Sequence, residues 1–117
     1  RDSFRHRKAG ASEVAVVSQH RWAIIHESRD EAAPSLENIL GKLAPCDLVI
    51  VEGYKRDTHD KIEVRNLVLD HPQLAGDDPT VVAIAATGPI AGTPVPVFDR
   101  DDVTALAGFI ERHMRLV

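Results

Sequence analysis

Asp47-Leu48-Val49-Ile50-Val51-Glu52-Gly53-Tyr54-Lys55 is the stretch from which the architecture of this chain is predicted. Its four consecutive branched apolar residues are typical of a strand that is buried on both faces of a parallel sheet. The run ends in Glu52, and ligands of open α/β sheets bind outside the carboxyl ends of the strands. We therefore expect the Glu52 carboxylate at a binding crevice, beside the turn-permissive Gly53 and the cation of Lys55.

The segments around this run carry alternating strand and helix patterns. Apolar runs at 14–17 and 22–25 predict a hairpin, because only four residues separate them. Residues 81–86 predict a second fully buried strand, and the prolines in 94–98 suggest an edge strand. Helices are predicted for residues 2–9, for residues 34–44 and for the apolar stripe from 103 to 117.

Buried strands that alternate with amphipathic helices predict an α/β fold with a mainly parallel sheet flanked by helices. The additional β-hairpin is expected outside that sheet. Lys61–Arg65 alternates charged and apolar residues, the pattern of a half-exposed strand, and we expect it to be an antiparallel or protruding addition. A length of 117 residues suits a single domain, 1–117.

Charge and composition narrow the functional class. The net charge of −4 argues against a general nucleic-acid binder, and no apolar stretch approaches the roughly 20 residues that span a bilayer. The single cysteine, Cys46, cannot form an internal disulfide and is expected to be a core thiol in a reducing compartment, the cytoplasm. The chain starts with Arg1 rather than methionine, so we expect its true beginning to lie upstream.

Glu52 and the basic residues after it are the candidates for chemistry. A carboxylate at a strand end can hold Mg²⁺, directly or through water, and Mg²⁺ bridges nucleotide phosphates. The alternative is that Glu52 caps a loop or pairs with Lys55. A phosphate or an acidic partner would be attracted to the basic loop, unless nearby acids balance it as a solvated loop. The basic loop comprises Lys55, Arg56, His59, Lys61 and Arg65. The six histidines show no zinc-site spacing.

Two stretches resemble a known family when they are taken together. Residues 1–11, RDSFRHRKAGA, followed by Ser18-Gln19-His20-Arg21-Trp22-Ala23, look like a stretch of the molybdopterin-guanine dinucleotide biosynthesis adaptor (MobB) family. Val51-Glu52-Gly53-Tyr54-Lys55, followed by Lys61-Ile62-Glu63-Val64-Arg65, resembles the second signature of that family. The order and spacing of the stretches also match, so the resemblance covers essentially the whole chain.

The resemblance implies a P-loop NTPase-like fold that binds GTP with Mg²⁺. It implies a cytoplasmic homodimer with slow GTPase activity that assists the guanylyltransferase joining GMP to molybdopterin. The residues it places at the nucleotide are Glu52, Gly53 and Lys55, with Glu52 also the metal-site acid. For Lys55 it leaves two alternatives open, the nucleotide and the partner protein. Asp2 and Ser3 match an Asp-Ser pair after the family's switch-like region, and Thr87 follows the second buried strand near the expected base.

The sequence departs from the family in two places. The Gly-x-x-x-x-Gly-Lys-Ser/Thr loop is absent, so 1–117 is expected to be the C-terminal, truncated portion of a P-loop GTP-binding domain, without tight GTP binding. Ala86-Thr87-Gly88 stands where the family often has a small polar residue and an aspartate. A side chain at Gly88 therefore cannot recognise the base.

Two other classes of function remain open. One is an ATP-dependent ligase of the same fold, similar to dethiobiotin synthetase, although such enzymes tend to follow the glutamate with a glycine-rich stretch rather than Tyr54-Lys55-Arg56. The other is a non-catalytic interaction domain in which Glu52 is structural.

Overall fold

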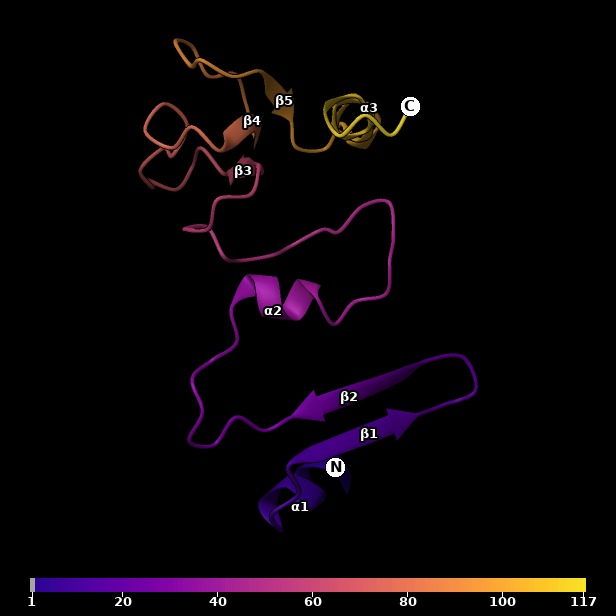
Figure 1. Cartoon of the computed structure of the whole chain (residues 1–117). Coiled ribbons are helices and arrows are strands. Elements are labelled where there is room, and N and C mark those ends of the chain that lie inside the picture. Colours follow the sequence, from indigo (N-terminus) through magenta and orange to yellow (C-terminus); the bar gives the residue numbers. More distant parts are fainter. Residues whose placement is uncertain (1) are drawn as a thin grey trace. The chain divides into compact units, whose positions relative to one another are not determined.

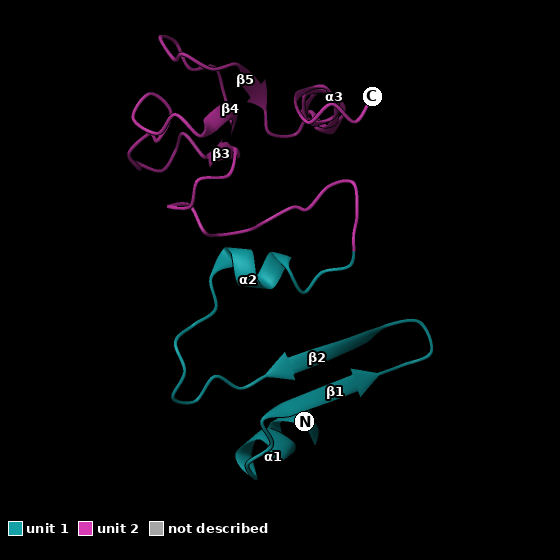
Figure 2. Ribbon diagram, in the orientation of Figure 1, with its two compact units in different colours: residues 1–44 teal, residues 45–117 magenta. Residues whose placement is uncertain are grey.

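The computed structural model describes residues 2–117, and Arg1, the first residue of the N-terminal signature, lies outside the described residues (Figure 1). The chain divides into two compact units, residues 1–44 and residues 45–117 (Figure 2). The elements of the first unit are α1 (Asp2–Lys8), β1 (Glu13–Val17), β2 (Trp22–His26) and α2 (Leu36–Leu40). The second unit contains β3 (Lys61–Arg65), β4 (Val81–Ala86), β5 (Val97–Asp99) and α3 (Val103–His113).

The first unit is built around the predicted hairpin. β1 and β2 pair antiparallel, with Val14 opposite Ile25 and Val17 opposite Trp22. The amide of Ser18 donates to the Arg21 carbonyl at 2.8 Å, which closes the turn. The predicted first helix is confirmed as α1, and it ends where Gly10 adopts a φ of 113°. Such a left-handed φ favours glycine, because no Cβ clashes there.

Helix α2 is shorter than the predicted helix over residues 34–44. Ser35 is its N-cap, and its hydroxyl accepts from the amide of Asn38 while the Asn38 side chain accepts from the amide of Ser35. This reciprocal capping fixes the start of the helix at Leu36. Gly41 ends it, so Leu43 lies outside the helix and is exposed.

The predicted strand over residues 48–51 is not formed. These residues carry no regular secondary structure, Ile50 is 79% exposed, and Cys46 is exposed rather than in the core. Within residues 2–117, no backbone hydrogen bond joins 48–51 to a strand. An apolar run becomes a strand only when a neighbouring strand satisfies its amides and carbonyls, and here it has no such neighbour.

The second unit contains a three-stranded parallel sheet in the order β3-β4-β5. Glu63 of β3 lies opposite Ile84 of β4, and Ile84 lies opposite Val97 of β5. The parallel sheet and β4, in which every residue except the partly exposed Val82 is buried, confirm the predicted α/β class. Lys61–Arg65 was wrongly expected to be an antiparallel or protruding addition, since it pairs parallel with β4 inside the main sheet. The alternating pattern reports exposure, and it does not specify strand direction.

The core of the second unit lies on the face of the sheet that carries Ile84. Ile84 and Ala86 are fully buried there with Val81 and Ala75, and the partly buried Leu74, Ile90, Val95 and Val97 pack against them. Glu63 shares this face and is itself 9% exposed, whereas Val64 on the opposite face is 71% exposed. β3 thus buries the side chain of Glu63 and exposes that of Val64.

Helix α3 is held to the sheet and to the loop before β3. The Phe109 ring packs on Phe98 of β5, with 5.3 Å between the centroids. At the end of the helix, His113 Nε2 lies 2.7 Å from the Asp60 carboxylate. The Asp102 carboxylate caps the first turn by accepting from the Ala105 amide. The predicted apolar stripe continued to Val117, but the helix ends at His113 because Arg115 takes a φ of 57°.

Within residues 2–117, no helix has the length and apolar character needed to cross a bilayer.

Candidate functional site

Glu52 lies on an exposed loop whose backbone is unusual. Gly53 and Tyr54 both have positive φ angles, 81° and 53°. A non-glycine residue in this region is uncommon, and such residues concentrate at ligand sites. The Tyr54 carbonyl then accepts from the Asp57 amide at 3.0 Å, which closes the following turn. The loop therefore presents the Glu52 carboxylate to solvent, although the strand that was expected to carry it is not formed.

Glu52 and Lys55 have no charged partner among the residues that the structure describes. Neither the Glu52 carboxylate nor the Lys55 ammonium forms a hydrogen bond or an ion pair with another residue in the part of the chain that the structure describes. The interpretation of Glu52 as an acid paired with Lys55 is therefore wrong. Both groups are free to contact a ligand.

Two members of the basic loop, Lys61 and Arg65, are engaged in contacts within the chain and are not available to bind a ligand. The Lys61 ammonium donates to the carbonyls of Asp57 and His59 and to the Thr80 hydroxyl. Arg65 donates to the His71 carbonyl at 3.1 Å and reaches the Glu63 carboxylate at 3.4 Å. Among the lysines and arginines of this loop, Lys55 and Arg56 therefore remain for an anionic ligand, and both are exposed.

The Thr80 hydroxyl continues the Lys61 network to an acid. Both the hydroxyl and the amide of Thr80 donate to the Asp78 carboxylate, at 2.6 and 2.9 Å. These hydrogen bonds stabilise the charged form and hold the pKa of Asp78 below its ordinary value of 3.8. The network ties the start of β3 to the start of β4, and it leaves no free group for chemistry.

Thr87 and Gly88 follow β4, as the sequence predicted. The Thr87 hydroxyl accepts from the Leu67 amide at 2.9 Å, and its own amide donates to the Arg65 carbonyl. A Cβ at Gly88 would lie 3.4 Å from a methyl group of Leu67. Thr87 therefore joins the ends of β3 and β4. Its proposed contact with a nucleotide stays a prediction.

Asp2 and Ser3 lie in the first turn of α1, in the other compact unit. Asp2 is exposed and complements the positive end of the helix dipole. Their role at the nucleotide also stays a prediction.

The donor set at Glu52 fits Mg²⁺ in one specific way. No three His, Cys, Asp or Glu side chains among residues 2–117 gather to form a metal cage. Mg²⁺ commonly keeps several waters and binds through one or two carboxylates and the phosphates of a substrate. A single exposed carboxylate beside an unpaired lysine suits that shared mode of binding.

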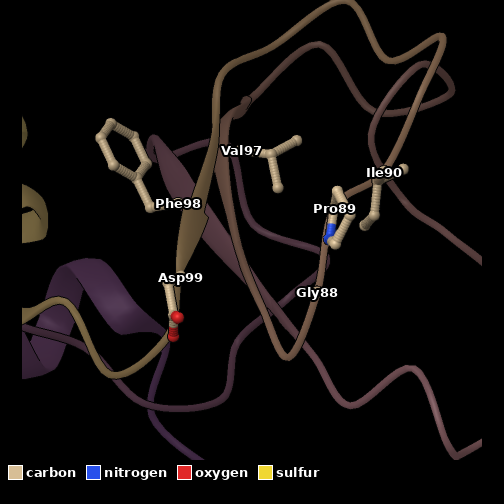
Figure 3. A pocket seen from close by; sticks show the side chains of 6 residues that line it. All are labelled: Gly88, Pro89, Ile90, Val97, Phe98 and Asp99. Atoms are coloured by element: carbon tan, nitrogen blue, oxygen red, sulfur yellow. The ribbon is translucent and has the colours of Figure 1, made fainter.

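Sequence reasoning missed Asp99, at the end of β5. Together with Gly88, Pro89 and Ile90 it borders a cleft of about 330 Å³ at the carboxyl ends of β4 and β5 (Figure 3). The signal was present, because Val97-Phe98-Asp99 is a strand that ends in an acid, as 48–52 was expected to be. The expected edge strand over 94–98 stopped one residue before Asp99.

Comparisons with known proteins agree along most of the chain. Residues 1–87 match the family described as molybdopterin guanine dinucleotide synthesis protein B, MobB. The molybdopterin-guanine dinucleotide biosynthesis adapter protein of Escherichia coli K12 is 34% identical over 118 residues, covering 98% of this chain and 67% of that protein. The Haemophilus influenzae protein of the same name is 32% identical, covering 97% of this chain and 63% of that protein.

A solved structure shares the fold. A crystal structure of molybdopterin-guanine biosynthesis protein B (mobB) matches 97% of this chain and 74% of its own, with a TM-score of 0.69 and 26% identity. The described arrangement of elements is therefore one that a solved protein also adopts.

Proposed function

Because the chain belongs to the MobB family, as its resemblance implied, we propose that it is an adaptor in the biosynthesis of the molybdopterin guanine dinucleotide cofactor. The observation that carries this proposal is the family match over residues 1–87, which includes the Glu52–Lys55 signature. The same match favours the adaptor over a ligase similar to dethiobiotin synthetase.

The proposed ligand is GTP with Mg²⁺. Glu52 would hold the metal or one of its waters, and Lys55 would contact phosphate. The support is that both groups are exposed and unpaired in the described part of the chain, and that Gly53 and Tyr54 hold the loop in a conformation uncommon for a simple connection. Bound Mg²⁺ would neutralise phosphate charge in support of slow GTP hydrolysis.

The proposed partners are a second copy of the chain and the guanylyltransferase that joins GMP to molybdopterin. The hairpin supports the first of these. Pairing of β1 with β2 puts Val17, Trp22, Ala15 and Ile24 on one face, which we call the Trp22 face. Trp22 is 71% exposed and Val17 is 74% exposed. Apolar side chains gathered on one exposed face are typical of a protein interface.

The proposed compartment is the cytoplasm. Cys46 is a free and exposed thiol, which is stable against oxidation only where the surroundings are reducing.

Glu52→Gln in the intact protein tests the metal role. The substitution keeps the size of the side chain and removes its charge, so we expect Mg²⁺-dependent GTP binding to weaken by about 10- to 100-fold, the range for a charge-assisted contact. Binding is measured by calorimetric titration with Mg²⁺ and with EDTA.

The matched control is Glu111→Gln, which removes an exposed acid on α3. It should leave the Mg²⁺ dependence unchanged. Equal Mg²⁺ dependence in Glu52→Gln and the parent protein would make Glu52 a structural acid.

A further inference from the structure

Lys55 and Arg56, the exposed cations of the basic loop, lie at the tip of a closed turn. The Tyr54 carbonyl accepts from the Asp57 amide across them at 3.0 Å, which makes the two cations the central residues of the turn. A turn on an exposed loop is only as rigid as its attachment to the rest of the fold. The position of both cations therefore depends on what holds Asp57.

The Lys61 ammonium holds the end of this turn. It donates to the carbonyl of Asp57, to the carbonyl of His59 at 3.0 Å and to the Thr80 hydroxyl at 2.7 Å. An ammonium has three donors and no acceptor, so these three acceptors satisfy it completely. Two of them belong to the loop and the third to the residue before β4, so the side chain ties the loop to the sheet.

The backbone of Lys61 is itself fixed by the sheet. Its amide donates to the Thr80 carbonyl at 2.8 Å, and Lys61 pairs with Val81 at the start of β4. The pairing register shifts between Lys61 and Ile62, and irregularities of this kind often re-aim a side chain. A side chain that leaves a rigid strand can hold a loop in one place. Lys61 thus has both a fixed base and a fully engaged ammonium.

We propose that Lys61 is a positioning residue for nucleotide binding: its ammonium fixes the turn so that Lys55 and Arg56 meet the phosphates of Mg²⁺-bound GTP. The inference rests on the proposed function, which supplies the ligand. Cations on a loose loop must be ordered when the ligand binds, and that ordering lowers affinity. Lys61 orders them in advance, while its own charge stays engaged within the chain.

A double-mutant cycle in the intact protein tests this role, with GTP and Mg²⁺ as the probe. Lys61→Met keeps most of the length of the side chain and removes the ammonium, so we expect GTP binding to weaken by about 5- to 10-fold. In a background that carries both Lys55→Met and Arg56→Met, the same change should weaken binding by less than about twofold, because the cations that Lys61 positions are already gone. Calorimetric titration measures the affinities, and circular dichroism checks that each variant is folded.

Lys42→Met is the matched control, because Lys42 is an exposed lysine of the other unit. It should leave GTP affinity unchanged. If Lys61→Met lowers GTP affinity equally in both backgrounds, or does not lower it, the positioning role is overturned while the proposed function stands. A parent protein that binds no guanine nucleotide overturns the proposed function and this inference together.

Thr80→Val repeats the cycle if Lys61→Met does not fold. It keeps the lysine and the size of the threonine side chain, and it removes one of the three acceptors of the ammonium. The Thr80 amide still donates to the Asp78 carboxylate, so the start of β4 is retained. We expect a loss of GTP affinity of about two- to threefold, again confined to the protein that has both cations. An equal loss in both backgrounds, or none, overturns the positioning role.

Discussion

Glu63 shows how one residue can anchor a long loop. Its carboxylate accepts from the amides of Leu74 and Ala75, with the shortest contact at 2.9 Å, and from the Arg65 guanidinium. Its side chain is only 7% exposed. Buried carboxylates are tolerated when each oxygen has donors, and the Leu74 and Ala75 donors belong to a loop that packs against Ile84. Glu63 thus connects the MobB signature on β3 to the core of the sheet.

Glu63→Gln should lower the free energy of unfolding by about 2–3 kcal/mol, since it replaces charge-assisted hydrogen bonds and turns an amide donor toward backbone donors. Urea denaturation followed by circular dichroism measures the loss. Glu111→Gln removes an exposed acid of the same type and should change stability by no more than about 0.5 kcal/mol. An equally small change for Glu63→Gln would mean that the loop is held by its apolar contacts alone.

The elements differ in how far the sequence predicted them. β3 and β4 were predicted with their observed bounds, because alternation in 61–65 and the unbroken apolar run 81–86 are both strong local signals. The run 48–51 carried the same kind of signal and formed no strand. Local pattern gives the tendency to extend, but a strand also requires a paired neighbour, and the pattern does not contain that information.

The hairpin is an element with a pH-dependent contact. His26 on β2 lies 2.7 Å from the Glu31 carboxylate and 3.0 Å from that of Glu13. These hydrogen bonds raise the pKa of His26 above its ordinary value of 6.5, and the bond to Glu31 makes the largest contribution. Because the folded pKa is the higher one, the stabilisation is complete below pH 6.5 and is lost as the pH rises through the raised pKa.

Replacing both acids, Glu13→Gln with Glu31→Gln, should therefore lower the pKa of His26 toward 6.5. A proton NMR titration of the imidazole measures the shift. Glu37→Gln, which removes an exposed acid on α2, should leave the His26 titration unchanged. An unshifted His26 in the double variant would show that the two carboxylates do not hold the ring in solution.

The whole molecule consists of two units with unequal cores. The second unit buries Ile84, Ala86 and Val81, whereas Val14 is the buried hydrophobic residue among those described in the first. A two-stranded hairpin is marginally stable by itself in water. Covering the Trp22 face would add the apolar burial that the first unit lacks, and the proposed second copy of the chain would cover it.

Trp22→Ser should weaken the proposed dimer by about 30-fold or more, because truncating a central aromatic side chain typically costs at least ~2 kcal/mol of association. Multi-angle light scattering across a dilution series of the intact protein measures the change. Val64→Ser is the matched control, since Val64 and Trp22 are each 71% exposed but lie in different units. A parent protein that stays monomeric at every concentration contradicts the dimer.

The sequence by itself determined the family, the α/β class, the hairpin and β4, because each depends on residue identity or on periodicity within a few neighbouring positions. Only the tertiary structure decided that β3 runs parallel inside the sheet, that 48–51 lacks a paired strand, and that Asp99 borders a cleft with Gly88. Pairing and juxtaposition join residues far apart in the sequence. The free energy of such contacts depends on which partner is present, and no local pattern specifies that partner.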